Sequence, residues 1–100
     1  MSHIYHITTA AEWEKAKPTG AYASASLALE GFNHCCTEAQ VEGVLQRYFA
    51  GKPDLVKLTI DTEKLKSQLV YDWSPSVQDT FPHIYGPINV DSVVEVEKLS

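Results

Sequence analysis

The sequence has 100 residues, of which 44% are hydrophobic and 21% are charged, and its formal net charge is -5 at pH 7. This length suits one hydrophobic core, so we expect a single domain over residues 1–100. The acidic balance argues against an extended nucleic-acid footprint, which needs clustered Lys and Arg. No apolar run reaches the about 20 residues of a membrane helix, and no secretory signal opens the chain, so we expect a cytoplasmic location and no membrane partner.

The chain opens with a predicted strand followed by a short helix. Bulky residues alternate over residues 4–8, which favours a strand. Thr9 and Glu12 match a capping box, in which the hydroxyl accepts from a free N–H of the first helical turn. The helix should end near Lys17, because Pro18 disfavours helical geometry in the residue before it.

The middle of the chain predicts a second and a third helix. Residues 26–31 resemble one helical turn closed by a glycine, and residues 32–35 predict a brief strand. A second capping box at residues 37–40 opens the clearest helix of the sequence. Its apolar residues recur at the spacing of one buried helix face, namely Val41, Val44, Leu45, Tyr48 and Phe49.

The second half of the chain is mostly extended. Residues 55–60 alternate, and their even-numbered members should point into the core. A further strand is predicted at 69–73, an exposed loop at 74–80, and a terminal strand at 93–99. Residues 81–88 predict a rigid, partly extended segment, because proline is tolerated only at sheet edges or bends.

These elements predict an α+β fold, since the helices are too short for the crossovers of a doubly wound sheet. The large aromatic residues expected in its core are Trp13, Trp73, Phe32, Tyr48 and Phe49.

Three segments together, at residues 4–8, 30–35 and 81–87, resemble the bacterial domain-of-unknown-function family 952. The resemblance extends from Ile4 to Leu99. It implies a compact fold related to the ADP-ribosyltransferase superfamily, with two small mixed or antiparallel sheets and short helices around a nucleotide cleft. It implies no established activity.

A more distant similarity concerns two of these segments. Residues 5–8 resemble the strand of ADP-ribosyl-transferring enzymes and RNA 2′-phosphotransferases whose histidine holds a ribose, and residues 31–35 resemble the second strand of the phosphotransferases. The similarity implies that His6 and His34 enter the cleft, and that NAD or a related nucleotide is the candidate cofactor. The single arginine, Arg47, and the absence of the usual catalytic glutamate argue against ordinary ADP-ribosyl transfer.

The candidate catalytic residues are His6, His34 and His83, because histidine is the side chain that exchanges a proton near neutral pH. We expect these rings to share one pocket. The alternative for each ring is an imidazole that is half-buried and bonded to a backbone carbonyl. Thr8 shares a strand face with His6 and is a candidate ligand-binding residue, which leaves Tyr5 and Ile7 to face the core. Asp72 is either an acid that orients a histidine or a solvated carboxylate.

Tyr85 is a second candidate ligand-binding residue, as a stacking ring or a hydroxyl, with a core aromatic as the alternative. Cys35 is a third, and it is either a nucleophile beside His34 or an inert buried thiol. Adjacent Cys35 and Cys36 are expected to be reduced. The residues themselves predict no metal site, because no compact zinc motif occurs.

The resulting hypothesis is a cleft that binds a nucleotide-like or ribose-bearing small molecule. If the protein is an enzyme, it would be a transferase or hydrolase with His83 as acid or base. The alternative is a non-catalytic module that binds a small molecule or zinc on the same scaffold.

Overall fold

The computed structural model describes residues 2–99, so Met1 and Ser100, the ends of the expected domain, lie outside the described residues. The strands are β1 (His3–Thr9), β2 (Ala21–Tyr22), β3 (Asn33–His34), β4 (Leu55–Asp61), β5 (Gln68–Ser74), β6 (Asp79–Tyr85), β7 (Ile88–Asn89) and β8 (Val93–Lys98). The helices are α1 (Ala10–Ala16), α2 (Ala25–Glu30) and α3 (Val41–Tyr48). The predicted α+β class is confirmed. Over residues 2–99, no helix is both long enough and apolar enough to cross a membrane.

Local signals set most of these boundaries. The Thr9 side chain accepts a hydrogen bond from the main-chain N–H of Glu12 at the start of α1. Gly31 ends α2 with a φ of 91°, a left-handed conformation that glycine adopts without strain. Thr37 and Gln40 form the predicted reciprocal capping box, although the turn they open is 3₁₀ before α3 begins.

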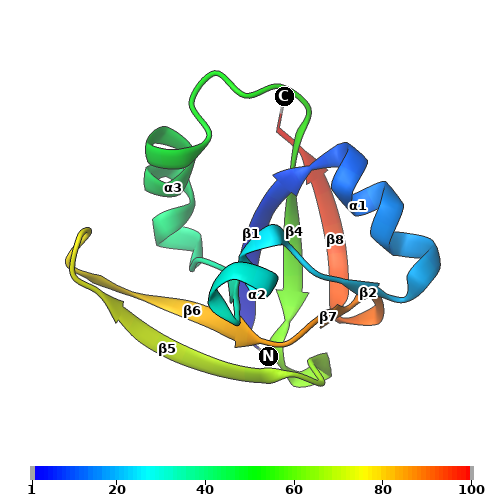
Figure 1. Cartoon of the computed structure of the whole chain (residues 1–100). Coiled ribbons are helices and arrows are strands. Elements are labelled where there is room, and N and C mark those ends of the chain that lie inside the picture. Colours follow the sequence, from blue (N-terminus) through cyan, green and yellow to red (C-terminus); the bar gives the residue numbers. More distant parts are fainter. Residues whose placement is uncertain (1, 100) are drawn as a thin grey trace.

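The strands form three antiparallel sheets, ordered β1-β4-β8, β2-β7 and β3-β6-β5 (Figure 1). We expected two sheets. The additional one pairs two residues of β2 with two residues of β7, and strands this short leave no alternating pattern in a sequence. The predicted loop at 74–80 is shorter than expected, because β5 and β6 form a hairpin that extends away from the other sheets (Figure 1).

A four-residue seam, residues 33–36, joins the two larger sheets. On one side of the seam, the N–H of Cys35 donates to the carbonyl of Pro82 in β6 (3.0 Å). On the other side, Cys36 and Tyr5 of β1 exchange two main-chain hydrogen bonds of 2.8 Å. The seam therefore places the histidine-bearing parts of β1, β3 and β6 next to one another.

Pro82 lies in the middle strand of its sheet, which corrects the expectation that proline occurs only at edges or bends. Its carbonyl faces the seam, where it accepts from Cys35. The N atom of a strand residue points to the same side as its carbonyl oxygen. The N atom of Pro82 therefore faces the seam, beyond the end of β3 at His34, and not β5. For this reason the missing N–H removes no hydrogen bond between β5 and β6.

The core lies between the β1-β4-β8 sheet and α1. Val56, Leu58 and Ile60 of β4 point inward as predicted and are at most 5% exposed. On β1 the core face carries Ile4 rather than Tyr5, which corrects the expected orientation of that strand. His6 and Thr8 share the face of Ile4 by alternation, so these polar side chains are embedded at the margin of the core.

Two of the expected core aromatics are at the surface. Trp13 is 5% exposed, as predicted, but Tyr48 is 54% exposed and Trp73 is 61% exposed. Phe32 and Phe49 are partly buried. The apolar face of α3 likewise includes no buried residue, because it borders an open hollow rather than another packed element.

Candidate active site

The three candidate histidines line one hollow of about 770 Å³. Its walls are contributed by β1, α2, the seam, α3 and the β5–β6 hairpin. Thr8 and Cys35 also line the hollow, whereas Tyr85 does not. This volume is in the range of small-molecule sites, about 300–1,000 Å³. The expectation that the rings gather at one place therefore agrees with the geometry, but the three rings differ in their surroundings.

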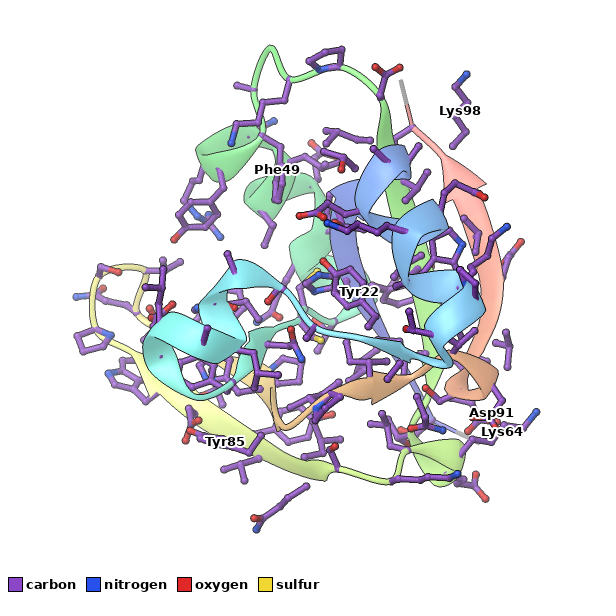
Figure 2. All side chains as sticks on the ribbon, turned by 45° about the vertical axis from the view of Figure 1, so that its right-hand side comes forward. Tyr22, Phe49, Lys64, Tyr85, Asp91 and Lys98 are labelled. Carbon is purple, nitrogen blue, oxygen red and sulfur yellow. The ribbon has the colours of Figure 1, made fainter. Side chains whose placement is uncertain are left out.

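His6 is held at both ring nitrogens and is 5% exposed. Its Nδ1 lies 2.5 Å from the carbonyl oxygen of His34, and its Nε2 lies 3.0 Å from the hydroxyl of Tyr22. A carbonyl oxygen only accepts, so Nδ1 carries the proton of the neutral ring, and the lone pair of Nε2 lies beside the Tyr22 hydroxyl. The Tyr22 hydroxyl lies 2.9 Å from Oγ1 of Thr8. Figure 2 shows Tyr22 in the middle of the molecule.

Burial lowers the pKa of His6 from 6.5 to about 4, and its hydrogen bond to the His34 backbone offsets only part of this effect. An imidazole in an apolar surrounding is less stable in its charged form, because it loses the hydration of the charge. His6 is thus neutral near pH 7, and its hydrogen bond to the His34 carbonyl joins β1 to β3.

His83 is held at one ring nitrogen. Its Nδ1 lies 2.9 Å from Oδ2 of Asp72, and the Tyr85 hydroxyl donates to the same oxygen at 2.5 Å. The β5–β6 register explains this cluster, because Val70 pairs with His83 and Asp72 pairs with Phe81. Cross-strand partners share a face, so Asp72, His83 and Tyr85 all project from the same side of the hairpin.

The ring of His83 stacks on Phe32, with 4.1 Å between centroids and 18° between planes. The two hydrogen bonds, from Tyr85 first and His83 second, lower the pKa of Asp72, and the bond to Asp72 raises the pKa of Tyr85. Asp72 is therefore a carboxylate near neutral pH. It accepts from Nδ1–H and fixes the tautomer of His83 in which Nε2 has the lone pair.

The Nε2 atom of His83 faces the hollow. Within residues 2–99, Asp72 is the hydrogen-bond partner of this ring, and no buried side-chain nitrogen or oxygen there lacks a partner. Because Nε2 has no partner, it is not fully buried. Since His83 lines the hollow, this is the space that the lone pair reaches.

His34 lies beside His83. The two residues are paired in the β3–β6 register, and their ring centroids are 5.0 Å apart. The His34 Nε2 lies 2.9 Å from Oε2 of Glu30, four residues earlier at the end of α2, and the His34 side chain is 52% exposed. The wall of the hollow thus has two neighbouring imidazoles, each bonded to its own carboxylate.

Both cysteines are free and buried. Burial raises the pKa of Cys36 to about 11, and the same effect raises the pKa of Cys35 further. A thiol with a raised pKa is protonated near neutral pH, and the thiolate is the nucleophilic form. Cys35 packs in the core cluster, so its contribution to the hollow is an apolar wall.

In the described chain, no three His, Cys, Asp or Glu side chains are arranged to hold a metal ion. The zinc alternative therefore has no ligand set among residues 2–99.

Several side chains that contact the three histidines were not predicted. The sequence offers no signal for Tyr22 or Glu30 as partners of His6 and His34. Phe32 was assigned to the core, and it stacks on His83 instead. The sequence leaves two alternatives for Asp72, an acid that orients a histidine or a solvated carboxylate, and in the structure its carboxylate is bonded to the His83 imidazole.

The fold and site describe a class of protein, an α+β domain whose short strands surround a hollow lined by histidines. The chain belongs to the family described as "Protein of unknown function (DUF952)", whose model matches residues 7–96. This confirms the family resemblance found in the sequence.

Solved structures of one relative are closely similar. The crystal structure of protein CC0527 from Caulobacter crescentus is 32% identical, with a TM-score of 0.89 over 99% of this chain and 87% of that chain. The solution NMR structure of CC0527 is 33% identical, with a TM-score of 0.84 over 100% of this chain and 86% of that chain. No curated protein matches the sequence significantly.

Proposed function

We propose that the hollow binds a ribose-bearing, nucleotide-like small molecule, and that His83 acts as the acid or base of a transfer or hydrolysis reaction at that ligand. The observation that supports this most directly is the Asp72–His83 pair, at 2.9 Å, on a ring that lines the hollow and whose Nε2 has no hydrogen-bond partner among residues 2–99. We also propose that the fold is related to that of the ADP-ribosyltransferases, as the sequence resemblance implies. The proposal further takes the protein to be a single domain located in the cytoplasm.

His83 would take a proton at Nε2 from a ligand hydroxyl or from water. Asp72 stabilises the resulting imidazolium, because its carboxylate already accepts the hydrogen on Nδ1. The ring then returns the proton to the leaving group. The stacking of Phe32 restricts the ring to one orientation, which favours proton transfer in a fixed geometry.

His34 would bind a ligand hydroxyl next to the reacting group, because its ring is exposed and adjacent to His83. Thr8 would contribute a second hydroxyl contact. His6 has both nitrogens occupied, so in this proposal it is a positioning residue that holds β3, and with it His34, in place.

The first experiment tests binding. NAD, ADP-ribose, AMP, adenosine and zinc are each added to the protein, and Tm is measured together with the NMR signals of the histidine rings. A ligand that binds only the folded state raises Tm. We expect a ribose-bearing compound to raise Tm and to shift the ring signals of His83 and His34. Zinc alone raising Tm, or no compound shifting those signals, contradicts the proposal.

The second experiment tests catalysis. Each compound that binds is incubated with the protein, and its products are separated by chromatography. Loss of a general base reduces turnover by about 10²- to 10⁴-fold, so His83→Asn should reduce turnover to this extent while binding persists. The matched control is His3→Asn, an exposed histidine on β1. Binding without turnover in the native protein leaves a non-catalytic binding module.

A further inference from the structure

Two aromatic side chains that line the hollow make no ring contact with its histidines in the described chain. Tyr48 from α3 and Trp73 from β5 both line it, and they are 54% and 61% exposed. Within residues 2–99, neither side chain stacks on another aromatic ring. The guanidinium carbon of Arg47 lies 5.7 Å from the centroid of the Tyr48 ring. Exposed aromatic rings that border a hollow are suited to stack on a planar group of a ligand.

Strand alternation directs Trp73 to the opposite face of the hairpin from His83. Both residues nevertheless line the same hollow. A ligand that contacts both therefore needs two kinds of group, a planar ring for Trp73 and hydroxyl groups for His83.

The charges around the hollow limit the ligand further. Lys52 is the one lysine or arginine among the lining residues, and its Nζ lies 5.4 Å from the centroid of the Phe49 ring. Two carboxylates, Glu12 and Glu30, border the same space. A bound pyrophosphate is usually met by several Lys, Arg or main-chain N–H donors. The lining side chains, with one ammonium group and two carboxylates, do not supply several cations for a pyrophosphate.

We infer that the hollow takes an uncharged aromatic glycoside of the nucleoside type, with its planar ring against Tyr48 and Trp73 and its sugar at His83 and His34, rather than NAD or another pyrophosphate. This inference rests on the proposed function and names its ligand class. The net charge of -5 acts in the same direction, because it repels polyanions from the surface.

The test measures Kd by calorimetry for four probes: ribose, adenosine, AMP and ADP-ribose. We expect adenosine to bind more tightly than ribose, AMP to gain nothing from its phosphate, and ADP-ribose to bind most weakly of the three adenine compounds. If ADP-ribose binds about 10-fold or more tightly than adenosine, a difference of about 1.4 kcal/mol, the inference is wrong while the proposed function stands. If no probe binds, the proposed function fails.

Matched variants test the ring contacts. Tyr48→Ala and Trp73→Ala should each weaken adenosine binding by roughly 5- to 100-fold, the range that loss of one base-stacking ring produces. The control is Tyr71→Ala, because Tyr71 is 52% exposed on β5 but does not line the hollow. All three side chains are at the surface, so Tm in the absence of ligand reports whether each variant still folds. Equal adenosine affinity in the three folded variants overturns the placement of the ring.

A charge variant completes the test. Lys52→Met should leave the Kd of adenosine within about twofold, because an uncharged ligand has no ion pair to lose. The same substitution should also leave AMP and adenosine equal. If Lys52→Met weakens AMP binding but leaves adenosine binding unchanged, Lys52 recognises a phosphate. That result would contradict an uncharged ligand.

Discussion

His6 and His83 border the same hollow, and they differ in what holds their nitrogens. His6 has a partner on both nitrogens and is buried against the core, and its pKa is lowered to about 4. His83 is also largely buried, but it has a partner on Nδ1 and a lone pair on Nε2 that reaches the hollow. Burial alone therefore does not distinguish a ring with two bonded nitrogens from a ring with one free nitrogen.

In the proposed function, the number of occupied ring nitrogens decides the role of each histidine. A ring bonded at both ends connects two strands and resists protonation. A ring bonded at one end to a carboxylate is oriented and retains one site for proton exchange. The experiments below test this distinction between the two histidines, in order of decreasing expected effect.

Removing the His6 ring should have the largest effect on stability. His6→Ala leaves a cavity and deprives the His34 carbonyl and the Tyr22 hydroxyl of their partner, which costs about 3 to 5 kcal/mol of unfolding free energy. Urea unfolding measures this loss. The control, His3→Ala, changes an exposed ring and should cost less than about 0.5 kcal/mol. Equal losses in the two variants would mean that the His6 contacts contribute nothing.

Acidification should produce the next largest effect. The pKa of His6 is about 4 in the folded protein and 6.5 in a free side chain, so the unfolded chain binds the extra proton between these values. The stability that neutral His6 provides is complete above about pH 6.5 and is lost as the pH falls toward 4, by about 3 kcal/mol in total.

Urea unfolding at several pH values measures this slope. His6→Gln should flatten it between pH 6.5 and 4, because glutamine does not titrate. The carboxyl groups with lowered pKa, Asp72, Asp79 and Asp91, lose their contributions below this window. If the unfolding free energy of the native protein is constant from pH 6.5 to 4, burial does not lower the pKa of His6.

Tyr22→Phe should have an intermediate effect. The substitution removes the hydroxyl that connects His6 and Thr8 and leaves Nε2 of a buried ring without its hydrogen-bond partner. We expect a loss of about 1 to 3 kcal/mol. Tyr71→Phe removes an exposed hydroxyl on β5 and should change stability by less than about 0.5 kcal/mol. A neutral Tyr22→Phe variant would remove the support for a hydrogen-bonded chain at His6.

Asp72→Asn should have the smallest effect on stability and a distinct effect on His83. The carboxylate is partly exposed, so unfolding by urea should change little. Without its acceptor, the Nδ1–H form of His83 is no longer favoured, and nitrogen NMR should show a larger fraction of the Nε2–H tautomer. Asp54→Asn, at an exposed turn, is the control. An unchanged tautomer ratio would show that Asp72 does not orient the ring.

The sequence predicted the elements that local interactions determine. The capping residues of α1 and of the turn before α3, the glycine after α2 and the alternation of β4 all act over a few residues. The exposure of Tyr48 and Trp73 was not predicted, because periodicity shows which residues share a face but not whether another element covers that face.

The candidate site was predicted in part. The three histidines line one hollow, as three separate sequence segments had suggested. Their roles depended on distant pairings, such as Asp72 with His83 and Tyr22 with His6, which arise from strand register and from the packing of β2. No local pattern encodes such a contact, since eleven residues separate the first pair and sixteen the second.

The seam at residues 33–36 couples the two halves of the molecule mechanically. Its amides are bonded to β6 on one side and to β1 on the other, and its His34 carbonyl receives the His6 ring. A ligand that fills the hollow and stabilises the arrangement of the hairpin and α3 should also stabilise these few hydrogen bonds. Hydrogen exchange at the Cys35 and Cys36 amides should therefore slow when the ligand binds. This exchange would report ligand binding without an attached label.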